Sequence, residues 1–138
     1  MAYTIGIIGG TGREGKGLAY RWAKAGHHII IGSRSEQKAQ AAVAELAVKL
    51  PEGVTIEGCL NQEAVERADI AAITVPFAAH AETLTALKPT LEGKILIDVV
   101  VPLSPAKVTR VSMPPEGSAA QQAQKILGEG VQVVAAFH

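Results

Sequence analysis

Three glycines near the start of the chain have the spacing of a phosphate-binding turn. Gly10, Gly12 and Gly15 form the pattern G-x-G-x-x-G directly after the apolar run 5–8. In this pattern the first glycine turns the chain off a strand, the second leaves room for a pyrophosphate, and the third lets a helix pack closely. The free N–H groups at the start of that helix would then face phosphate oxygens. The residues expected to contact a dinucleotide here are Gly10, Thr11, Gly12, Arg13 and Glu14.

A second polar group follows the next apolar run, 29–31. An NAD site usually places an acidic residue at this point, to accept hydrogen bonds from the adenosine ribose. The chain has Gly32, Ser33 and Arg34 instead, with Lys38 one helical turn further on. A hydroxyl and two cations suit a 2′-phosphate, because a guanidinium and a phosphate form charge-assisted hydrogen bonds. The sequence therefore predicts NADP(H) rather than NAD(H), with Thr11 offering a further hydroxyl to the same phosphate.

Two later strand ends complete the expected site, since ligands of parallel sheets bind beyond the carboxyl ends of the strands. The residues predicted there are Thr74, Val75 and Pro76, with Phe77 beside them, and Val101, Pro102 and Leu103. This lining is apolar and suits hydride transfer, in which the cofactor carries the reaction and the protein positions it. The sequence shows no Ser-His-Asp arrangement, Tyr-Lys pair or cluster of metal ligands, so we expect no catalytic side chain and no metal.

Two titratable residues in this half of the chain receive structural interpretations. Asp98 lies inside an apolar run, which favours a buried, hydrogen-bonded carboxylate. His80 falls in the first turn of an expected helix and is interpreted as a surface histidine.

Alternation of apolar runs with helical periodicity defines the elements that position these residues. Strands are expected at 5–8, 29–31, 54–58, 70–75, 95–101 and 131–137. Helices are expected at 13–25, 36–50, 61–68, 78–91 and 118–127, with Asn61 and Ser118 as caps and a loop at 104–117. Continuous apolar runs indicate a sheet covered on both faces. The fold class predicted is α/β, a doubly wound parallel sheet of the Rossmann type with six strands in the order 3-2-1-4-5-6.

Composition limits the possible partners and environment. The 138 residues predict a single domain, 1–138, and the formal net charge of zero argues against nucleic acid or an acidic membrane surface as partner. No apolar run has transmembrane length, and the start of the chain has no signal peptide, which together predict a cytoplasmic protein. Cys59 is the only cysteine, so we expect a structural thiol in a reducing compartment.

The motifs resemble those of one family, the NADPH-dependent reductases of the deazaflavin coenzyme F420 (F420H2:NADP+ oxidoreductases). The matching segments are Gly9 to Gly12, Gly32 to Arg34 with Lys38, Val75 with Pro76, and Gly117 to Ala120. The resemblance implies that Thr11, Ser33, Arg34 and Lys38 hold the 2′-phosphate. It also implies that Val75 and Pro76 border the nicotinamide and that Pro102 and Leu103 border the deazaflavin.

Members of that family continue into a small helical domain that completes the deazaflavin pocket and contributes to dimerisation, and this domain is absent from the sequence. The resemblance thus implies an oxidoreductase that moves hydride between NADP(H) and coenzyme F420 or a flavin, incomplete as this chain alone. A homodimer mate or a separate helical subunit would close the site. The alternative is a non-catalytic NADP-binding module. The Gly-Ser-Arg signature is also similar to that of the cytoplasmic domains of membrane metalloreductases, which leaves a flavin or another acceptor open.

Overall fold

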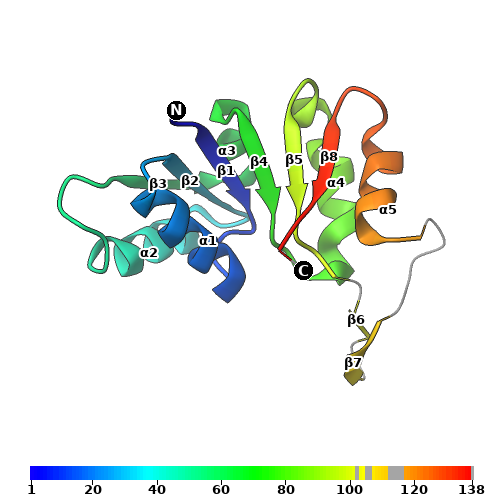
Figure 1. Ribbon diagram of the computed structural model, residues 1–138, viewed down its shortest axis with the longest axis horizontal. Coiled ribbons are helices and arrows are strands. Elements are labelled where there is room, and N and C mark those ends of the chain that lie inside the picture. The colour runs from blue at the N-terminus through cyan, green and yellow to red at the C-terminus, as the bar shows by residue number, and fades with distance from the viewer. Residues whose placement is uncertain (102, 105–106, 112–116, 138) are drawn as a thin grey trace.

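A single six-stranded sheet of parallel strands runs through the molecule in the order β3-β2-β1-β4-β5-β8 (Figure 1). The computed structural model describes residues 1–101, 103–104, 107–111 and 117–137. The strands of the sheet are β1 (Thr4–Ile8), β2 (His28–Ser33), β3 (Ile56–Leu60), β4 (Ile70–Ile73), β5 (Ile95–Asp98) and β8 (Gln132–Ala135). The predicted Rossmann order is confirmed, with β8 as the sixth strand of the sheet.

Five helices cover the two faces of the sheet. They are α1 (Arg13–Lys24), α2 (Glu36–Ala47), α3 (Asn61–Arg67), α4 (Phe77–Leu91) and α5 (Ala119–Leu127). Neighbouring strand residues point to opposite faces, so Ile7 packs with α1 and α2 while Ile8 packs with α3, α4 and α5. Both isoleucines have no exposed surface, so β1 is covered on both of its faces.

The observed strands and helices differ from the predicted ones at their ends. Strand β5 ends at Asp98 rather than Val101, because the Asp98 carboxylate accepts the N–H of Val100 in place of a strand neighbour. Asn61 is not a cap: helix α3 has Leu60 at its N-cap, and the Asn61 side chain bonds elsewhere. Ser118 does cap α5 as predicted, and it does so in a reciprocal arrangement with the side chain of Gln121.

The segment expected to be a loop contains two short strands, β6 (Leu103–Ser104) and β7 (Lys107–Val111), which pair antiparallel. Residues 105–106 and 112–116, also part of that expectation, lie outside the described residues. In Figure 1 this pair lies beyond the carboxyl ends of the parallel strands, where the chain passes from β5 toward α5.

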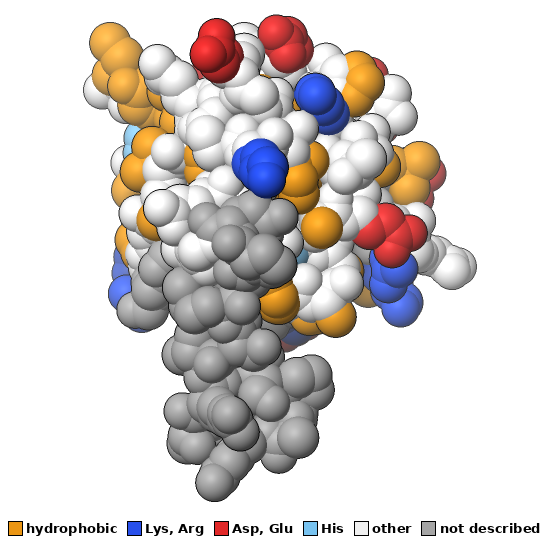
Figure 2. Space-filling view, turned by 90° about the vertical axis from the view of Figure 1, so that its right-hand side faces the viewer, with side chains coloured by type: hydrophobic (Ala, Val, Ile, Leu, Met, Phe, Trp, Pro, Cys, Tyr) orange, Lys and Arg blue, Asp and Glu red, His pale blue; other side chains and the backbone are white. Residues whose placement is uncertain are grey.

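Charges on the molecule are mixed. Figure 2 shows basic and acidic side chains scattered among hydrophobic ones on the side it presents, with neither sign forming a continuous field. None of the helices in the described part of the chain is long and apolar enough to cross a membrane.

Candidate cofactor site

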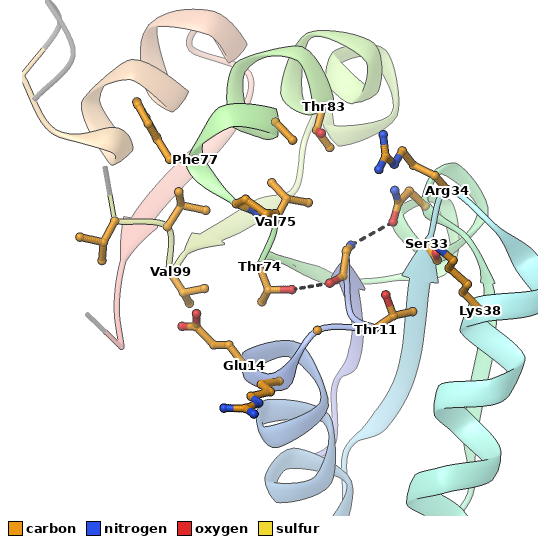
Figure 3. Close-up of a pocket in the computed structure, with 18 of the residues that line it drawn as sticks. Thr11, Glu14, Ser33, Arg34, Lys38, Thr74, Val75, Phe77, Thr83 and Val99 are labelled. Atoms are coloured by element: carbon orange, nitrogen blue, oxygen red, sulfur yellow. Dashed lines mark hydrogen bonds between the residues drawn. The ribbon is translucent and has the colours of Figure 1, made fainter. Parts of the chain in front are cut away.

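A cleft of about 910 Å³ opens at the carboxyl ends of the parallel strands (Figure 3). The residues that line it are Gly9, Thr11, Gly12, Arg13, Glu14, Ser33, Arg34, Ser35, Lys38, Asn61, Thr74, Val75, Pro76, Phe77, Ala79, Thr83, Val99, Val100, Val101 and Phe137. Its size is typical of sites for large organic ligands. Strand β1 and helix α1 contribute the glycine turn, β2 the polar group, and β4 and β5 the apolar wall.

The glycine turn is shaped as the pattern predicts, except that its strained position is one residue earlier. Gly9, not Gly10, has the positive φ (69°) that only glycine adopts freely. Gly10 is tightly packed, because a Cβ there would lie 3.0 Å from the Ile31 side chain. A Cβ on Gly15 would lie 2.6 Å from Gly10 Cα, so Gly15 lets α1 pack against the turn.

Gly12 stands apart from the other glycines of the motif. A Cβ built on it meets no atom within 4 Å, and its φ of −79° suits any residue. It is the N-cap of α1 and provides no side-chain cap, so the first N–H groups of the helix have no partner from a capping side chain. The open space at Gly12 therefore lies at the positive end of a helix, which is where an anion binds well.

Ser33 and Arg34 lie at the end of β2, and Lys38 lies in the first turn of α2. Ser33 is 6% exposed, and its hydroxyl oxygen accepts the Ser35 N–H at 3.1 Å, which leaves the hydroxyl proton available to an acceptor in the cleft. Ser35 caps α2 by accepting the N–H of Lys38. Within the described residues no ion pair includes Arg34 or Lys38. This part of the cleft is therefore an uncompensated basic corner.

The side chains of Thr74 and Asn61 form hydrogen bonds with the backbone at the start of the glycine turn. The Thr74 hydroxyl lies 3.0 Å from the carbonyl oxygens of both Ile8 and Gly9. The Asn61 Oδ1 accepts the Gly9 N–H at 3.1 Å, and Figure 3 shows the two bonds at Gly9. The Thr74 hydroxyl is thus engaged with the protein rather than open to the cleft. The sequence does not indicate Asn61 as a site residue, because its partner Gly9 is 52 residues away.

The apolar wall of the cleft comes from the ends of β4 and β5. Val75, Phe77 and Val99 line the cleft, and the Glu14 side chain lies beside Val99 (Figure 3). Val101 lines the cleft as expected. Pro102 lies outside the described residues, and Leu103 is placed only as the first residue of β6. Two further residues that the sequence did not suggest, Thr83 from α4 and Phe137 after β8, also reach this cleft.

His80 is not at the surface, as its sequence position suggested, but fully buried. Its Nε2 lies 2.7 Å from Oδ2 of Asp98, whose side chain is equally buried. The helical periodicity of α4 turns position 80 toward the sheet along with Leu84 and Leu87. The interpretation of Asp98 as a buried, hydrogen-bonded carboxylate is confirmed.

Cys59 and possible metal ligands lie apart from this chemistry. Burial raises the pKa of the Cys59 thiol, which disfavours the reactive thiolate at neutral pH. Among the described residues no three His, Cys, Asp or Glu side chains come together as a metal site would require.

The strand order, the glycine turn and a cleft at the point where the winding reverses define a Rossmann-type dinucleotide-binding domain. Residues 4–102 match the family described as NADP oxidoreductase coenzyme F420-dependent. The chain belongs to this family.

Relatives and solved structures agree with this assignment. The chain is 39% identical to an F420-dependent NADP reductase of Methanothermobacter thermautotrophicus, over 100% of its own length and 62% of the relative's. It is 40% identical to that of Methanocaldococcus jannaschii, over 96% of its length and 61% of the relative's. It therefore spans less than two thirds of the curated relatives that it matches.

Among solved structures, a proposed F420-dependent NADP reductase from Arthrobacter sp. FB24 is 28% identical with a TM-score of 0.77, covering 96% of this chain and 61% of that one. The NADP-bound pyrroline carboxylate reductase of Plasmodium falciparum has a TM-score of 0.61 at 17% identity, covering 96% of this chain and 41% of that one. The second likeness concerns the fold alone.

Proposed function

We propose that this chain binds NADP(H) and forms the dinucleotide-binding part of an F420-dependent NADP reductase. The observation that carries the proposal is the basic corner of Ser33, Arg34 and Lys38 at the end of β2. A ribose 2′-phosphate placed there would meet one hydroxyl and two cations, and no carboxylate lines that corner to favour the 2′-hydroxyl of NAD(H).

The described residues fit the rest of a dinucleotide. Gly12 leaves open space at the start of α1, where a pyrophosphate would receive the helix N–H groups and Arg13 lies nearby. Thr11, between the two phosphate positions, lines the same cleft. The 2′-phosphate and the pyrophosphate would therefore be held by separate groups, from β2 with α2 and from β1 with α1.

The wall formed by Val75, Pro76, Val99 and Val101 would hold the nicotinamide half. NADP(H), when bound, would supply or accept the hydride, and the apolar wall would orient its ring and exclude water. No residue of this wall is an acid or a base, so the contribution of the protein would be positioning.

The acceptor in this proposal is coenzyme F420, because the relatives that match the chain throughout are named F420-dependent NADP reductases. We propose further that a homodimer mate or a separate subunit completes the acceptor side of the cleft. Phe137 lines the cleft and Val134 lies on the last strand, and they are 58% and 50% exposed. A reducing, cytoplasmic setting agrees with the single free thiol.

Replacing Arg34 by alanine tests the proposal. Arg34→Ala is expected to weaken NADPH binding by about 1.5–3 kcal/mol, the range for hydrogen bonds to charged groups. Binding of NADH should barely change, because it carries no 2′-phosphate. Calorimetric titration with each dinucleotide measures both losses.

A matched control is Arg21→Ala, which removes an exposed cation from the last turn of α1, outside the cleft. It should leave both affinities unchanged. Equal losses for NADPH and NADH in Arg34→Ala would contradict a 2′-phosphate site. Tight NADPH binding without hydride transfer to F420, in an assembly whose acceptor side is complete, would favour the non-catalytic binding module.

A further inference from the structure

Behind the apolar wall of the cleft lies a buried polar pair that the proposed chemistry does not use. His80 and Asp98 have no exposed surface, and their side chains meet at 2.7 Å between Nε2 and Oδ2. A carboxylate only accepts, so the imidazole donates this hydrogen bond. The Nδ1 of the same ring lies 3.2 Å from Oε1 of Gln122, which ties α4 to α5.

The other oxygen of Asp98 controls the backbone that follows β5. Its Oδ1 accepts the N–H of Val100 at 3.0 Å, a side-chain turn that ends the strand. The main-chain carbonyl of Asp98 meanwhile accepts the N–H of Ala136, which holds β5 against the end of β8. Val99, Val100 and Val101, the residues set by this turn, all line the cleft.

The imidazole supports a second part of the same wall. The rings of His80 and Phe77 lie 5.8 Å apart at 31°, and Phe77 is one of the residues that line the cleft. The buried imidazole of His80 therefore contacts both the side chain of Phe77, the first residue of α4, and the carboxylate of Asp98, the last residue of β5.

A contribution to the stability of the fold does not by itself explain why this polar pair is buried. Burying two ionisable groups carries a desolvation cost, and hydrophobic replacements of similar volume are often as stable or more stable. What apolar side chains would not supply is the directional bond to the Val100 N–H, which fixes the backbone of the wall. The pair thus has a local geometric consequence at the cleft.

We infer that His80 and Asp98 are positioning residues that hold the Val99–Val101 wall against the nicotinamide half of the cofactor. The inference rests on the proposed function, because it assumes that NADP(H) occupies the cleft. We infer no part for this pair in binding the 2′-phosphate. The basic corner that would bind that phosphate lies on β2 and α2, across the cleft from Val99 (Figure 3).

Comparing NADPH with adenosine 2′,5′-bisphosphate separates these two halves, because the bisphosphate lacks the whole nicotinamide mononucleotide: the nicotinamide, its ribose and one phosphate of the pyrophosphate. In the wild-type chain NADPH should bind about tenfold more tightly than the bisphosphate. Asp98→Ala removes both the bond to His80 and the bond to Val100, so this ratio should fall to near one while bisphosphate affinity stays within about twofold. Asp98→Asn keeps an oxygen for the Val100 N–H and should stay within about threefold of the wild-type ratio.

Leu84→Ala is the matched control. Leu84 is also fully buried on α4, one turn beyond His80, but does not line the cleft. Its variant should lower the melting temperature without moving the ratio. A ratio that falls equally in Leu84→Ala would show that general loosening, not positioning, is measured, and would overturn the inference.

Hydrogen exchange of the wild-type chain provides a second measurement that needs no variant to fold. Exchange of the Val100 amide should slow on adding NADPH and stay unchanged with the bisphosphate. Unchanged exchange with NADPH, an unaltered ratio in Asp98→Ala, or equal wild-type affinities for the two ligands would each contradict the inference. Failure of the wild-type chain to bind either ligand would instead contradict the proposed function.

Discussion

The Gly12→Val variant is expected to lose NADPH binding while keeping its fold. A side chain at Gly12 would project into open space, with no protein atom within 4 Å of its Cβ, and the extended backbone there accepts a branched residue. That same space is where we place the pyrophosphate, so valine would exclude it. Affinity should fall at least about 100-fold, or about 2.8 kcal/mol, in calorimetric titration. The melting temperature without ligand should stay within about 3 °C of wild type.

Gly17→Val gives the matching control. Gly17 belongs to the same helix, is equally free of neighbours, and lies outside the cleft. Its variant should bind NADPH normally. Normal binding by Gly12→Val as well would mean that the phosphates lie elsewhere, whereas a large loss of stability in Gly12→Val would mean that the open space is not as described.

The His80→Leu variant should lose about 3 kcal/mol of the free energy of unfolding, at the lower end of the range for breaking a buried pair. Leucine fills much of the volume of the imidazole but offers no donor to the Asp98 carboxylate. The Asp98 carboxylate would still accept the hydrogen bond from the Val100 N–H, which limits the loss of stability. Urea denaturation measures it, and a change below about 1 kcal/mol would show that the imidazole contributes little beyond its volume.

Combining His80→Leu with Asp98→Val completes a double-mutant cycle. Because the double variant no longer buries a carboxylate beside an apolar side chain, it should be more stable than the sum of the two single losses predicts. Additive losses would argue that the two side chains act independently, against the short contact between them.

The strand order was predictable because each apolar run forms a strand of one parallel sheet, and right-handed crossovers leave few ways to connect six of them. The ends of the elements were less predictable. Strand β5 stops at Asp98 because a side-chain bond replaces the ladder, and Asn61 leaves the cap of α3 to hold Gly9. Such bonds join residues whose proximity depends on the finished fold.

The residues of the candidate site also divide into those that could be predicted from the sequence and those whose place depends on the finished fold. Thr11, Ser33, Arg34 and Lys38 were predictable because they lie within or directly after motifs whose chemistry is local, and the structure brings them to one cleft. Their roles toward a 2′-phosphate stay predictions. Thr83, by contrast, reaches the cleft only through the packing of α4. His80 was misplaced because a histidine in the first turn of a helix has no local signal for burial.

A crystal structure of this chain with NADP+ would locate each part of the dinucleotide in the cleft. We expect the 2′-phosphate within hydrogen-bonding distance of Ser33 and Arg34, near Lys38, and the pyrophosphate over Gly12 at the start of α1. The nicotinamide ring should lie against the wall of Val75 and Val99. A dinucleotide bound outside this cleft, or one whose 2′-phosphate points to solvent away from Arg34, would contradict the proposed NADP(H) site.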